Sequence, residues 1–92
     1  MFELNHIIAA SAVDAEEMRL REVLASAGYD VAKLTLTSLA QQAVAERAKA
    51  TVTRLGIPLI TAMHEGQPDG AVQVRFVFET DNDQSLAKVV LA

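Results

Sequence analysis

The chain contains no cysteine among its 92 residues. Disulfide bonds, thiolate nucleophiles and metal sites built on cysteine are therefore excluded. Aromatic residues are also scarce, with three phenylalanines, one tyrosine and no tryptophan. Much of the 51% hydrophobic fraction is alanine, which buries little area per residue. Because small domains with a thin core often gain stability by self-association, we expect a homodimer.

Basic residues are outnumbered, since 8 Lys and Arg face 12 Asp and Glu, for a net charge of −4. Proteins that bind nucleic acid usually present a basic surface, so this balance disfavours such a partner. No apolar run approaches the ~18 residues of a membrane span. The first residues, "MFELNHIIAASAVDA", lack the basic start of a signal peptide. We therefore expect a cytoplasmic protein without a membrane partner.

The hydrophobic periodicity predicts one small domain over residues 1–92, of the α/β (or α+β) class, with the order β-α-β-α-β-β-α. The expected strands are 2–9, 29–37, 57–64 and 71–80, and the expected helices are 14–28, 38–55 and 81–92. A strand–helix–strand unit favours parallel pairing through a right-handed crossover, and the late hairpin adds antiparallel strands. The sequence therefore predicts a mixed sheet of about four strands with helices packed on it.

Segment 34–58 allows two interpretations, a helix-turn-helix or one long helix. A helix-turn-helix needs a tight turn, yet every residue of "VAERAKA" is acceptable inside a helix. Thr37 or Ser38 can cap the start of a single helix, and Gly56 can end it. We therefore predict one helix that lies across the sheet.

Three stretches resemble parts of known families. "ATVTR" resembles the helix-turn-helix of DNA-binding regulators. "LREVLASAGYDVA" resembles the first helix and second strand of response-regulator receiver domains, but "IIAASAVDA" stands where their acidic pair is expected and no phosphoacceptor Asp ends a third strand. The element order and "LGIPLI" are similar to a thioredoxin-like domain. That resemblance implies a cis Ile57–Pro58 bond and, without redox cysteines, an adaptor role.

Six side chains are candidates for a binding surface: Arg47, Lys49, Arg54, Met18, Met63 and Val77. Arg47 and Arg54 share one flank of the long helix, where they form either a ridge for an anion or partner, or a solvated flank that covers apolar surface. The three apolar candidates are expected on the polar sides of their elements or near a loop. A contiguous patch of such residues would mark an interface, whereas scattered ones are ordinary.

His6, His64 and Glu65 are weak candidates for metal ligands. Two imidazoles and a carboxylate could hold a metal if their strands were adjacent, but no ligand spacing supports this, and ordinary hydrogen-bonded histidines are the alternative. No Ser–His–Asp pattern, glycine-rich loop or acid–base pair is found in the sequence. We therefore predict no catalytic residue and no cofactor.

These observations lead to two hypotheses. The first is a non-catalytic protein–protein interaction domain that regulates, adapts or inhibits another protein. The alternative is a nucleic-acid-binding regulator that uses Arg47, Lys49 and Arg54.

Overall fold

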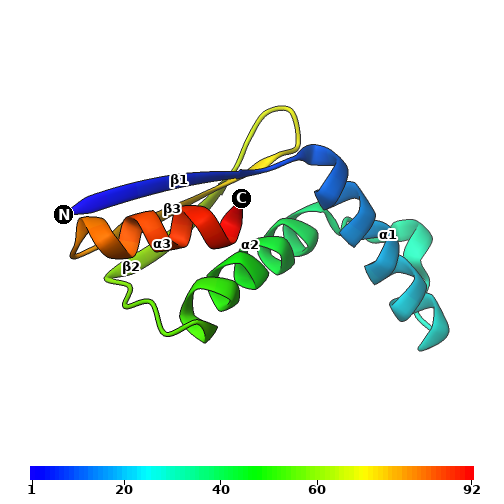
Figure 1. Ribbon diagram of the computed structural model, residues 1–92. Coiled ribbons are helices and arrows are strands. Elements are labelled where there is room, and N and C mark those ends of the chain that lie inside the picture. Colours follow the sequence, from blue (N-terminus) through cyan, green and yellow to red (C-terminus); the bar gives the residue numbers. More distant parts are fainter.

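The computed structural model describes residues 1–92 as a three-stranded antiparallel sheet with two helices on one face (Figure 1). The central strand β3 (Val72–Phe78) lies between β1 (Phe2–Ile8) and β2 (Thr61–Gly66). Helices α2 (Thr37–Arg54) and α3 (Asp81–Leu91) pack on the sheet, and α1 (Ala10–Ser26) packs on α2 and projects to one side. The chain is therefore a small α+β domain.

The alternation of residues in β3 decides which face of the sheet is buried. Val72, Val74, Phe76 and Phe78 are fully buried beneath the helices, whereas Arg75 on the opposite face is exposed. The rings of Phe76 and Phe78 stack with centroids 6.2 Å apart. Several of the α2 residues in this core are alanines, which add little buried area. Only 16 of 92 residues are buried, so the expected thin core is confirmed.

The prediction of one long helix is confirmed, because α2 runs unbroken through the segment that resembles a helix-turn-helix. It ends as expected at Gly56, which adopts a φ of 76°. The amide of Ile57 donates to the carbonyl of Val52 at 3.4 Å, and both side chains are buried in the core. This end is a Schellman motif with its usual apolar contact.

The predicted capping of α2 by Thr37 or Ser38 is wrong. The N-cap is Leu36, and no side chain caps the helix there. Leu36 is itself buried, so the start of the helix is held by packing instead of by a side-chain hydrogen bond.

The predicted strand at 29–37 is also wrong. The chain instead forms a short 3-10 turn, η1 (Val31–Lys33), followed by extended backbone without strand partners. The Arg21 guanidinium donates to the carbonyls of Val31 and Leu34 at 2.8 and 3.3 Å. These carbonyls accept hydrogen bonds from Arg21 of α1, and α1 does not lie on the sheet. The segment is therefore held away from the strands and pairs with none of them.

The finer predictions about the fold are not confirmed. The sheet has three strands instead of about four, every pair is antiparallel, and the thioredoxin-like order is not found. The Ile57–Pro58 bond is trans, since the chain has no cis peptide bond. The strands β1 and β3 form where the sequence predicts them, whereas β2 covers Thr61–Gly66 instead of 57–64.

Two predicted helix starts also differ from the structure. Helix α1 begins at Ala10, four residues before Asp14, and its N-cap makes no side-chain hydrogen bond. Helix α3 is capped by Thr80, whose hydroxyl accepts from the Asp83 amide at 3.1 Å, in place of the expected Asp or Asn.

The molecule is elongated, with extents of 47 × 27 × 19 Å and a radius of gyration of 14.9 Å. A compact chain of this length would have a radius of gyration of about 12 Å. The projecting α1 accounts for the difference (Figure 1). None of the helices combines the length and the apolar character needed to cross a membrane.

We predict that Gly56→Ala destabilises the fold by about 1 kcal/mol, because alanine is strained at the positive φ that ends α2. Urea unfolding measures the change. Leu55→Ala is the matched control, since this neighbouring side chain is exposed and should change the stability by less than ~0.5 kcal/mol. Equal stability of the two variants would contradict the assigned helix end.

Candidate functional site

Helix α1 is attached to α2 through the carboxylate of Glu16. Arg19 donates to it from Nη2 at 2.6 Å and from Nε at 3.2 Å, and Arg47 of α2 donates at 2.8 Å. The Glu16 side chain is only 4% exposed, while both arginine side chains are more than half exposed. The bond from Arg19, followed by the bond from Arg47, lowers the pKa of Glu16 from 4.5 to about 2. Glu16 therefore stays ionised and joins the two helices.

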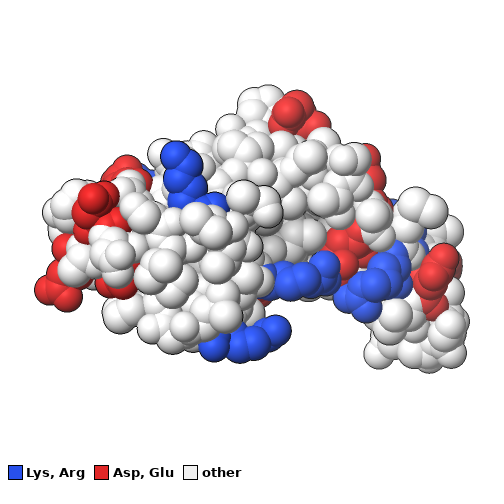
Figure 2. Space-filling model, viewed as in Figure 1, with Lys and Arg blue, Asp and Glu red and all other residues white.

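A cleft of about 310 Å³ opens beside this cluster, where β1, α2 and the end of α3 meet, with one residue of α1 at its edge. Its apolar lining comes from β1, α1, α2 and the end of α3: Ile8, Ala12, Val44, Ala48, Val90 and Leu91. His6, Arg47 and Thr51 supply the polar lining. Figure 2 shows Lys and Arg side chains at this hollow with an acidic group directly beside them, and further acidic groups at both ends and at the top of the molecule.

The outer side of α3 continues the apolar lining of the cleft. Leu86 and Val89 are 47% and 74% exposed. Residues three and four positions apart are neighbours on a helix, so these two side chains form a stripe with Val90, which lines the cleft. We call Leu86, Val89, the cleft, Arg19 and Arg47 together the helical face.

Acidic side chains lie at the opposite end of α3 from the cleft. Asp81 and Asp83 occupy the first turn of the helix, and Glu79 precedes it. Along α3 the molecule therefore presents acidic groups, an apolar stripe and the cleft that Arg47 lines.

The structure separates the three cations that the sequence suggested as one group. Arg47 and Arg54 share a flank of α2, but Lys49 lies about 160° around the helix from Arg47. Lys49 pairs with Glu46 at 3.1 Å, and Arg47 is bound to Glu16. The cation that joins Arg47 is Arg19, which the sequence analysis did not select because the contact spans two helices.

The three apolar candidates do not form one patch. Met18 is exposed on α1, whereas Met63 and Val77 lie on the face of the sheet without helices. Met63 is half exposed there, and Val77 is only 8% exposed. The apolar residues that do cluster are Leu86 and Val89. Their spacing was visible in the sequence, but it could not show which side of α3 faces the core.

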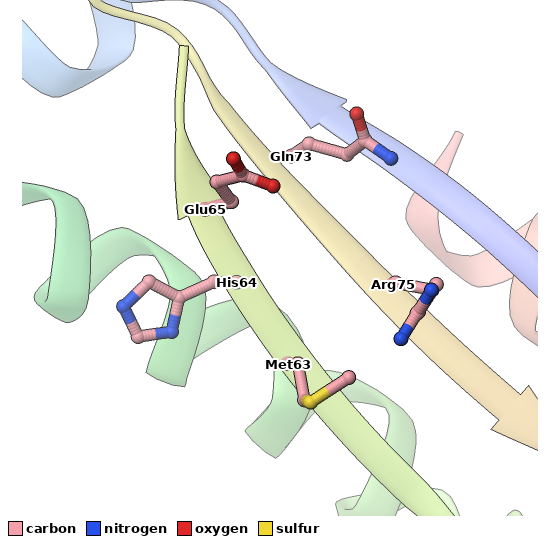
Figure 3. A pocket seen from close by; sticks show the side chains of 5 residues that line it. All are labelled: Met63, His64, Glu65, Gln73 and Arg75. Carbon is pink, nitrogen blue, oxygen red and sulfur yellow. The ribbon is translucent and has the colours of Figure 1, made fainter.

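The helix-free face of the sheet holds a second hollow of about 310 Å³. Figure 3 shows its lining residues, with His64 pointing to the other side of the sheet from Met63, Gln73 and Arg75. Gln73 donates to Asn5 at 3.1 Å, and Arg75 lies 3.9 Å from Glu3. Polar groups that satisfy one another in this way are typical of a solvated antiparallel sheet face.

The condition for a metal site at His6, His64 and Glu65 is not met. Both histidines are paired with Val74 of β3, which separates their strands, so their backbones lie about 10 Å apart. Glu65 is paired with Gln73 and points to the opposite face. No group of three potential ligands is found in the chain. Burial lowers the pKa of His6 beside the cleft.

We predict that Glu16→Gln loosens α1 by on the order of 2 kcal/mol at neutral pH, because the ionised pairing with two arginines is lost. Since the pKa of Glu16 is lowered in the folded state, its stabilisation is complete above about pH 4.5 and is lost as the pH falls toward 2. The difference between wild type and variant should shrink over that range. Hydrogen exchange of α1 amides measures it.

Glu17→Gln is the matched control. Glu17 pairs with Arg21 within α1 at 3.0 Å and does not reach α2. Such a pair contributes less than ~1 kcal/mol, so α1 should stay protected. Equal exchange in both variants would show that Glu16 does not hold α1 in place.

No protein-family model, curated protein or solved structure matches this chain. Its function therefore has to be inferred from its own residues and contacts.

Proposed function

We propose that this chain is a small non-catalytic protein–protein interaction domain that binds its partner through the helical face. The observation that carries the proposal is the exposed stripe of Leu86 and Val89, which runs directly into an apolar cleft. Scattered exposed apolar residues are normal, but a stripe that joins a cleft is a connected patch of the kind found at interfaces.

The chemistry of the helical face fits a protein partner. Apolar side chains occupy its centre, and Arg19 and Arg47 stand at its rim. Interfaces commonly combine an apolar centre with a polar rim, and arginine is enriched in them. Burying one valine or leucine side chain contributes about 1.5–3 kcal/mol. The stripe and cleft together could therefore support a specific contact.

The alternative, nucleic-acid binding, has weaker support. Glu16 neutralises part of the charge of Arg19 and Arg47, and Lys49 lies on another side of α2. The net charge of −4 opposes approach to a phosphate backbone. We keep this alternative as an outcome of the test below.

A photo-crosslinking amino acid at Val89 tests the proposal in cells of the native host. Val89 is 74% exposed, so the substitution should leave the fold intact. We expect adducts with one defined protein, a second copy of the chain included. The matched control is the same amino acid at Ile7, an exposed apolar position on the helix-free face of the sheet.

Two results would contradict the proposal. One is a level of protein adducts at Val89 no higher than at Ile7. The other is an adduct at Val89 that nuclease removes, which would favour the nucleic-acid alternative.

A further inference from the structure

We infer that the partner of the helical face is a second copy of this chain, bound with its α3 antiparallel to the first α3 about a two-fold axis. This inference rests on the proposed function and names its partner. Two features of α3 support it: the position of the exposed stripe and the acidic residues at the end of the helix away from the cleft.

The exposed stripe sets the register of the two helices. An axis midway between residues 87 and 88 places Leu86 of one copy opposite Val89 of the other, and the reverse. Each copy then covers the two most exposed apolar side chains of α3. If the two-fold axis passed at Leu86 or at Val89, that residue would meet its own equivalent. The other residue would then have no large exposed apolar side chain opposite it.

The same register brings opposite charges together. With a rise of 1.5 Å per residue, Asp83 of one copy falls roughly 2 Å beyond Leu91 of the other. Asp83 lies on the same side of α3 as Val90, which lines the cleft together with Leu91 and Arg47. Asp83 of each copy is therefore placed near the end of the other copy's cleft, toward Arg47, and the contact repeats by symmetry.

The helical face can complement a second copy of itself. In a two-fold contact one surface must complement itself, and here Asp83, the apolar stripe and the cleft with Arg47 lie in an order that does so. A standard interface covers ~800 Å² on each side, roughly one seventh of the 5800 Å² surface of this chain. A dimer formed through the helical face has to cover an area of that order.

The absence of cysteine allows a direct test of the register. Leu86→Cys and Val89→Cys are prepared separately with different tags, mixed and oxidised. We expect disulfides between the two variants to exceed those within either variant at least ~5-fold, because only the 86–89 pair lies face to face. Ile7→Cys on the helix-free face is the control and should crosslink little.

Sedimentation equilibrium measures the association itself. We expect a dimer with a Kd on the order of 10–100 µM, weakened several-fold by high salt. Val89→Arg should weaken it at least ~10-fold, and Asp83→Lys should weaken it and reduce its salt dependence. Ile7→Arg is the matched control and should dimerise like the wild type. Circular dichroism checks that each variant is folded.

The possible failures are distinguishable. A strict monomer at ~1 mM, or 86–89 disulfides that are no more frequent than disulfides at 7, overturns the inference. If Val89 still crosslinks to a different protein in cells, the proposed function stands without the dimer. If Val89 forms no protein adduct, both are overturned.

Discussion

The position of α1 depends on one buried carboxylate. Apart from Val13, Glu16 is the only residue of this 17-residue helix that is fully buried, and it is held by Arg19 and by Arg47 of α2. A buried charge is stable only when it is paired and hydrogen-bonded, and both arginine heads remain in contact with water. Because Arg47 also lines the cleft, the cluster that holds α1 on α2 also forms part of the helical face.

The thin core explains why so much apolar surface remains outside. Alanines of α2 approach the sheet but bury little area, and the sheet has only three strands to cover. Two helices cover one face of the sheet, and α1 packs on α2 instead of on the sheet. Exposed apolar residues on α1 and α3 are the consequence.

Local patterns in the sequence were sufficient for several elements. The alternation in β3 and the hairpin that precedes it were predictable, since each depends on neighbouring residues. The long helix was predictable because its stripe, its helix-forming interior and Gly56 all agree. Segment 29–37 failed for the opposite reason. Its alternation suits a strand, but Arg21 binds its carbonyls, and that contact crosses elements.

By itself the sequence determined that helices and strands are mixed in one fold, the order of most of these elements, and the exclusion of cysteine chemistry. Only the tertiary structure decided that the sheet is wholly antiparallel, that Lys49 lies apart from Arg47, and that Val74 separates the two histidines. It also decided that Leu86 and Val89 face outward beside a cleft. The physical reason is that periodicity tells which side of an element is apolar, whereas pairing and packing determine what that side meets.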